Sequence, residues 1–271
     1  MNQRRIVTRR VALKDMGKAG LAVMVFGVTA CSNDDSGSTT TTTARSVSTT
    51  EVEDVDTTLA VSTTAASPPS TEITSPSQFH RVELGGVAAY ILYRGGEAAL
   101  VDTGDPGSLA AIEAGLTSIG LDWSSVGHVI VTHEHRDHMG SLGEVVEAAP
   151  TAEVYAGLQD IPAMMGVAQP KPVGNNGRVF DLDIIATPGH TPGHISVLDR
   201  VAGVLVAGDA LSNRGGELSG SPLPFTDDVT VANASVKTLA QLEYDVVLFG
   251  HGEPILSGGS DEVKRLASGL P

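Results

Sequence analysis

Short apolar runs alternate with polar, glycine-rich turns from residue 78 to the end of the chain, and this pattern predicts alternating strands and helices. The runs typical of strands lie at 87–93, 98–101, 128–131, 153–156, 178–182, 184–186, 195–198, 203–207 and 246–249. The first two flank the turn Arg94-Gly95-Gly96-Glu97, which predicts a hairpin.

Apolar residues recur at helical spacing in four other segments. In 108–119 they stand three and four positions apart, and Gly120 then ends the predicted helix. The other predicted helices cover 139–148, 230–242 and 260–267. Strands followed by helices in both halves predict one α/β domain over 77–271, with two sheets packed together and helices outside.

The first 31 residues predict an export signal. They hold six basic side chains and one acidic side chain, followed by an uncharged stretch over 19–30. Arg9-Arg10 and the residues around them resemble the twin-arginine consensus, and Val28-Thr29-Ala30-Cys31 resembles a lipoprotein box. We therefore expect export, lipidation at Cys31, and a membrane-anchored protein on the outer face of the cytoplasmic membrane or elsewhere in the cell envelope.

Residues 32–76 have a different composition. They are rich in Ser, Thr, Asp, Glu and Pro, include five consecutive threonines at 39–43, and lack apolar periodicity. Such a segment cannot bury enough apolar surface to fold, so it is predicted to be a disordered linker between the signal and the folded domain.

The charge balance limits the partners. The chain has 17 basic and 32 acidic residues, a formal charge of −15. Residues 77–271 alone hold 10 basic and 24 acidic side chains, which disfavours nucleic acid and leaves a small molecule as the expected partner. A single cysteine, Cys31, excludes a disulfide framework and every multi-cysteine zinc motif.

The main chemical signal is the run Thr132-His133-Glu134-His135-Arg136-Asp137-His138, directly after a predicted strand. Three imidazoles and a carboxylate on one strand-to-helix loop can point to a common centre. Two further histidines stand in 187–194, and an aspartate and another histidine each follow a later strand: the four are His190, His194, Asp209 and His251. Imidazole nitrogens combined with carboxylate oxygens are ligands that suit zinc.

In this order, the motifs H-x-H-x-D-H, T-P-G-H-T-P-G-H, G-D and G-H-G resemble the signature of the metallo-β-lactamase superfamily, over about 83–255. The resemblance implies a four-layer αββα sandwich with two divalent metal ions at one edge between the sheets. Zinc is expected, with iron or manganese as alternatives. By matching position, the first ion would be held by His133, His135 and His190, the second by Asp137, His138 and His251, and Asp209 would bridge both.

Two other residues match the family pattern without matching a ligand position. Asp102, in the strand-end sequence Asp-Thr-Gly, is expected to orient a ligand through a hydrogen bond. His194 is expected to support the site rather than bind metal. His80 and His128 belong to no ligand motif, and we expect them to be structural.

The family implies hydrolysis by a hydroxide shared between two metal ions. Asp137 would be the catalytic residue, orienting that hydroxide and passing a proton to the leaving group. The expected substrate is a small ester, lactone or thioester. Segment 211–228, with Arg214 as its only cation, is predicted to be a substrate loop, and 161–176 to form the opposite wall.

Three alternatives remain at this point. The first is a redox enzyme with a single iron, similar to persulfide dioxygenases. The second is a β-lactam hydrolase, although not of the subclass with a cysteine ligand, because the only cysteine is Cys31. The third is an extracytoplasmic metal-binding protein without catalytic activity.

Overall fold

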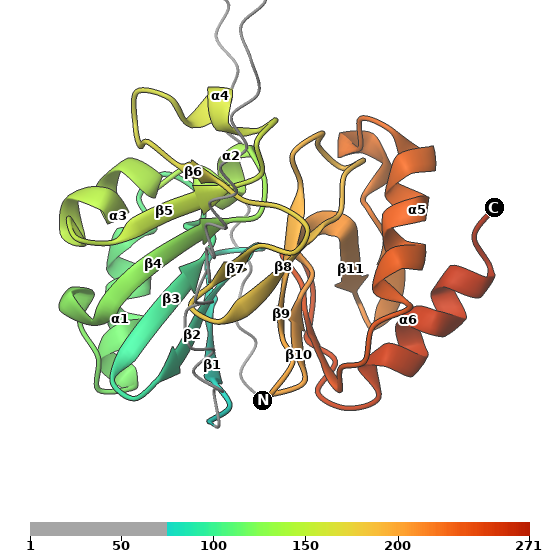
Figure 1. Ribbon diagram of the computed structural model, residues 1–271, viewed down its shortest axis with the longest axis horizontal. Helices are drawn as coiled ribbons and strands as arrows, with labels where there is room; N and C mark the ends of the chain where they lie inside the picture. Colours follow the sequence, from blue (N-terminus) through green and yellow to red (C-terminus); the bar gives the residue numbers. More distant parts are fainter. Residues whose placement is uncertain (1–74) are drawn as a thin grey trace, which may run out of the picture. The chain divides into compact units, whose positions relative to one another are not determined.

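The computed structural model describes residues 75–271. The predicted signal, Cys31 and all but the last two residues of the predicted linker lie outside the described part. Two β-sheets lie face to face, and helices cover the outer side of each (Figure 1). This arrangement is the predicted αββα sandwich. No helix within 75–271 is long and apolar enough to cross a membrane.

The first sheet contains strands β1 to β6 in chain order. β1 to β3 form an antiparallel meander that includes the predicted hairpin, and β3 to β6 run parallel. The strands are β1 (Gln78–Glu83), β2 (Ala88–Arg94), β3 (Glu97–Val101), β4 (Val126–Val131), β5 (Glu153–Ala156) and β6 (Lys171–Pro172). Its connections hold α1 (Leu109–Ser118), η1 (Trp123–Ser125), α2 (Arg136–Met139), α3 (Leu142–Ala148) and α4 (Ile161–Met164).

The second sheet has the order β13-β10-β9-β8-β7. Its strands are β7 (Arg178–Val179), β8 (Leu182–Ala186), β9 (Ile195–Asp199), β10 (Val204–Val206) and β13 (Val246–Leu248). Helices α5 (Val229–Leu239) and α6 (Gly259–Ser268) lie on its outer side (Figure 1).

Alternating side chains divide the core into three layers. On β2, Ala89 and Ile91 pack toward α1 and α3, whereas Tyr90 and Leu92 pack between the sheets. On the far side of the second sheet, alternate residues pack against α5 and α6. The period of two along the strands therefore places each sheet between two apolar layers.

The structure differs from the predicted elements in several places. The helix predicted at 139–148 is divided into α2 and α3, because Gly140 N–H donates to Gly104 O at 2.8 Å instead of continuing one helix. The break predicted at residue 183, between strands at 178–182 and 184–186, lies instead at Phe180 and Asp181, which both have positive φ. Strand β1 was not predicted. In the structure it pairs antiparallel with β2.

The predicted loop 211–228 is partly regular. It contains the hairpin β11 (Leu211–Arg214) and β12 (Glu217–Gly220), followed by the turn η3 (Leu223–Phe225). Gly215 and Gly216 both have positive φ, as a tight hairpin turn requires. Another turn, η2 (Gly208–Ala210), precedes the hairpin.

Candidate metal centre

Strand direction brings the predicted ligands to one edge of the second sheet. β8 and β10 are both antiparallel to β9, and β13 is parallel to β10, so β8, β10 and β13 end at the same edge. His190, Asp209 and His251 follow these three strand ends. The loop after β4 joins them, because Ile195 N–H donates to Thr132 O at 2.9 Å.

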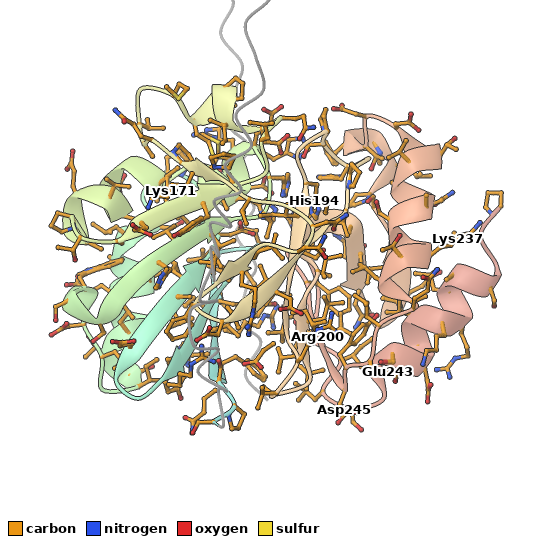
Figure 2. The ribbon with its side chains drawn as sticks, in the orientation of Figure 1. Lys171, His194, Arg200, Lys237, Glu243 and Asp245 are labelled. Atoms are coloured by element: carbon orange, nitrogen blue, oxygen red, sulfur yellow. The ribbon has the colours of Figure 1, made fainter. Side chains whose placement is uncertain are left out.

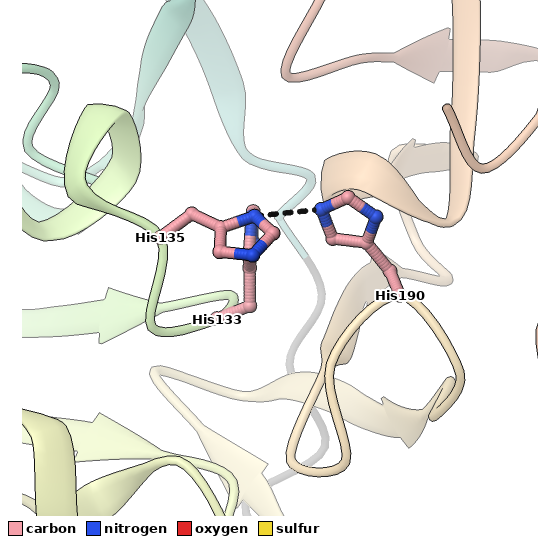
Figure 3. A group of neighbouring side chains, drawn as sticks. All are labelled: His133, His135 and His190. Atoms are coloured by element: carbon pink, nitrogen blue, oxygen red, sulfur yellow. Dashed lines mark hydrogen bonds between the residues drawn. The ribbon is translucent and has the colours of Figure 1, made fainter. Parts of the chain in front are cut away.

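His133, His135 and His190 form one group of candidate ligands (Figure 3). One nitrogen of each ring lies within 4.8 Å of the others. His190 Nε2 and His135 Nδ1 are 2.9 Å apart. This is the set of residues that the family resemblance assigns to the first ion.

Asp137, His138 and His251 form a second group with the same spacing. Asp209 lies between the two groups: its carboxylate oxygens are 3.4 Å from His138 Nε2, 3.5 Å from His190 Nε2 and 3.4 Å from His251 Nε2. The structure thus brings all seven predicted ligands together, and Asp209 holds the position expected of a bridge.

The donor atoms fit a cation. Three of these atoms, His133 Nε2, His138 Nε2 and Asp209 Oδ1, are buried and have no hydrogen-bond partner within residues 75–271. Burying unpaired polar atoms is costly, and a metal ion would give them a partner. Burial and the neighbouring imidazoles keep the pKa of His133 well below its usual value and lower the pKa of His190 to about 3. Both rings are therefore neutral at pH 7 and have a free lone pair for coordination.

Asp102 contacts His138, one of the candidate ligands. Its Oδ2 is 2.8 Å from His138 Nδ1 and accepts from the Thr132 hydroxyl, while Oδ1 accepts from Thr132 N–H at 2.7 Å. Because Nδ1 is engaged, Nε2 of His138 faces the other ligands. Asp102 has φ 63°, a conformation unusual for a residue other than glycine.

His194, labelled in Figure 2, has both ring nitrogens engaged by the protein. Nε2 accepts from Asp209 N–H at 3.0 Å, and Nδ1 is 2.8 Å from the Thr187 hydroxyl. Its position supports the backbone at Asp209 and leaves it out of both ligand groups.

Similar contacts hold His251 and His133. The carbonyl of Gly86 is 2.7 Å from His251 Nδ1, and the Thr132 hydroxyl is 3.0 Å from His133 Nδ1. In each ring Nδ1 contacts a protein oxygen, so Nε2 is the nitrogen left to bind a metal.

Sequence reasoning missed Asp160. This fully buried side chain accepts hydrogen bonds from Glu134 N–H, the Thr191 hydroxyl and Gly193 N–H. It thereby joins the two histidine-bearing loops. In the sequence it precedes Ile161-Pro162 and suggests only a helix cap, yet its side chain makes no capping hydrogen bond to α4.

His80 and His128 lie outside both ligand groups. His80 is on β1, and the His128 ring lies 6.2 Å from Tyr155 and 5.6 Å from Phe180, measured between ring centroids.

A hollow of about 390 Å³ opens over the ligand cluster. As predicted, segment 211–228 lines it, through Arg214, Pro222 and Phe225. The other predicted wall is wrong, because no residue of 161–176 lines this hollow. Met164 is buried in the core beneath the first sheet, and Met165, Ala168 and Lys171 line a separate hollow beside β5. The remaining lining residues are His135, Arg136, Asp137, Asp209 and His251.

Sequence and structure comparisons agree on the family. The profile of the metallo-beta-lactamase superfamily matches residues 82–251. The chain belongs to this superfamily. Its relatives include the probable metallo-hydrolase YflN of Bacillus subtilis, which is 32% identical over 58% of this chain and 75% of YflN.

Two relatives carry names that state an activity. The thioesterase pkgB of Emericella nidulans is 28% identical over 65% of this chain and 48% of that protein. A hydroxyacylglutathione hydrolase of Dechloromonas aromatica is 33% identical over 59% of this chain and 55% of that enzyme.

The crystal structure of a metallo-beta-lactamase family protein from Thermus thermophilus shares the fold. It has a TM-score of 0.54 at 24% identity, covering 71% of this chain and 77% of that one. Members of the superfamily typically bind divalent metals, and the chain is related to its hydrolases.

Proposed function

We propose that this protein is a binuclear metallo-hydrolase that cleaves a small ester, lactone or thioester, with a thioester as the first choice. The convergence of seven ligand side chains with three unpaired buried donor atoms carries the proposal. The two relatives named as a thioesterase and a hydroxyacylglutathione hydrolase support a thioester.

The two ligand groups would each hold one ion, and Asp209 would contact both. Divalent ions bound there would lower the pKa of water from about 16 toward about 7 and polarise the scissile carbonyl. The borderline-soft imidazole nitrogens favour zinc, with iron or manganese as alternatives. No side chain of the cluster needs to act as a nucleophile.

Asp137 would position the attacking water. Its Oδ2 is 3.2 Å from His251 Nε2, and it lines the open hollow. The hydrogen bond from His251 lowers the pKa of Asp137, so the carboxylate is ionised at neutral pH. An ionised carboxylate accepts hydrogen bonds, so Asp137 would orient the attacking water toward the carbonyl, accept the proton that this water loses, and pass it to the leaving group.

We also propose that the chain is exported and anchored by a lipid on Cys31, with a small molecule and no nucleic acid as its partner. The twin-arginine-like segment and the cysteine after an apolar run support anchoring, and the acidic charge of the chain supports the absence of nucleic acid. Metabolic labelling with a fatty acid tests the anchor: label on the native chain and none on Cys31→Ser is expected. Label on both the native protein and the Cys31→Ser variant would overturn the proposed anchor at Cys31.

Metal-quantified protein assayed against thioesters, esters, lactones and β-lactams tests the proposed activity. We expect two metal ions per chain, thioester hydrolysis without oxygen, and loss of both activity and metal in His133→Ala and Asp209→Ala. Full turnover by either variant at unchanged metal content would overturn the proposal. One iron per chain with oxygen consumption would favour the redox alternative.

A further inference from the structure

A second hollow adjoins the one over the candidate metal centre. Its volume is also about 390 Å³, and the two share Pro222 as a lining residue. The second hollow, here called the α5–α6 groove, lies between strand β12, turn η3 and the two C-terminal helices. Its apolar lining includes Leu223, Val229, Ala232, Leu266 and Leu270.

Turn η3 separates the two hollows. Phe225 lines the hollow over the ligand cluster, whereas Leu223 and Thr226 line the groove. The Thr226 hydroxyl is 3.4 Å from His190 Nδ1, so the wall of the groove contacts a candidate ligand directly. A molecule bound at the metal centre can therefore extend over Pro222 into the groove.

The chemistry of the lining selects an apolar ligand. None of the described residues that line the groove carries a charge. Leu223 and Phe225, on the ridge between the hollows, are 68% and 64% exposed, and covering them would remove apolar surface from water.

We propose that the α5–α6 groove binds the unbranched apolar chain of an acyl substrate whose carbonyl lies at the metal centre. The inference rests on the proposed hydrolase function and adds a substrate class to it. Binding energy from such a remote chain can increase turnover as well as affinity. Each methylene that enters the groove is expected to raise kcat/KM by up to about fourfold.

A series of acyl thioesters from acetyl to decanoyl tests the chain-length dependence. Leu223→Asp puts a charge on an exposed groove residue, and Leu256→Asp is a matched control, because Leu256 is 62% exposed and lines neither hollow. We expect kcat/KM to rise with chain length in the native protein and in Leu256→Asp. In Leu223→Asp the ratio of decanoyl to acetyl kcat/KM is expected to fall at least tenfold. Equal rates along the series, or the same ratio in both variants, would overturn the inference.

Binding of the product-like acids gives a measurement that does not need turnover. Calorimetry on the metal-loaded protein should show that decanoate binds at least tenfold more tightly than butyrate, and Leu223→Asp should remove this difference. Equal affinity for the two acids would overturn the inference that the groove binds the acyl chain, even if the protein is an active hydrolase. Tight decanoate binding without hydrolysis of any thioester, ester or lactone would support acyl-chain binding in the groove and overturn the proposed function.

Discussion

The carboxylate of Asp160 accepts a 2.6 Å hydrogen bond from the backbone N–H of Gly193, 33 residues later in the chain. The same side chain also accepts from Glu134 N–H at 3.1 Å. One buried carboxylate therefore connects the loop of His133 and His135 to the loop of His190. The relative position of these imidazoles depends on that connection.

Replacing Asp160 should weaken metal binding. Asp160→Ala leaves Gly193 and Glu134 N–H groups unpaired in the interior, so the two loops lose their shared acceptor. Loss of such a supporting contact typically lowers metal affinity by about 10- to 100-fold. Competition with a chromophoric chelator measures the affinity. Asp122→Ala, which removes the exposed cap of η1, should leave it unchanged. Unaltered affinity in folded Asp160→Ala would contradict this role.

Asp102→Asn should weaken the ion held by His138 more than the other. Asparagine tolerates the positive φ of 63° found here, so the backbone can remain in place. An amide has one acceptor oxygen where the carboxylate has two, so asparagine cannot accept from Thr132 N–H at one position and from the Thr132 hydroxyl and His138 Nδ1 at the other. We expect about 10- to 100-fold weaker binding of one ion in a two-step metal titration. Asp105→Asn, an exposed neighbour, serves as control. Equal weakening of both ions would count against a specific link to His138.

Gly208 should not tolerate a side chain. It has φ +55°, and a Cβ would lie 2.8 Å from His194 Nε2 and 3.0 Å from Thr132 Cβ. Gly208→Ala should therefore displace His194 from Asp209 as well as strain the backbone, with a loss of about 1–3 kcal/mol in the free energy of unfolding. Gly215→Ala isolates the backbone effect, because it shares the positive φ but has open space around it. Chemical denaturation compares the two variants, and an equal loss in both would show that the contact with His194 has no effect.

The metal-free domain should be most stable near pH 6.5, the usual pKa of histidine. Burial keeps the pKa of His133 well below its usual value and lowers that of His190 to about 3. Their rings are neutral in the fold but charged in the unfolded chain in acid, so the free energy of unfolding falls as the pH falls below about 6.5.

His138 has the opposite effect. Burial alone would lower its pKa, but Asp102 and Asp209 outweigh burial and raise the pKa to about 9. Its stabilising contribution is therefore complete below about pH 6.5 and is lost as the pH rises through about 9. Urea unfolding of chelator-treated protein across this range measures both limbs. His138→Gln should reduce the alkaline decline and leave only the part that His251 contributes, because Asp137 and Asp209 also raise the pKa of His251. Saturating metal should abolish the decline, and a decline of unchanged size in His138→Gln would refute the assignment.

Much of the site could be predicted from the sequence because its ligands occur in short local motifs. His133, His135, Asp137 and His138 stand on one strand-to-helix turn, where spacing alone brings them together. His190, Asp209 and His251 each follow a strand whose apolar pattern was recognisable. The order of these motifs resembles the signature of the metallo-β-lactamase superfamily, and that resemblance implied the four-layer fold.

Other features depended on contacts between segments distant in the chain. The role of Asp160 exists only because Gly193 and Glu134 lie beside it, and nothing in its local sequence indicates those partners. The helix break at Gly140 likewise follows from its hydrogen bond to Gly104. The groove beside Leu223 required α6 to pack close to η3. Local pattern determined the chemistry and the elements, whereas long-range packing decided which groups support the ligands and where a substrate has room.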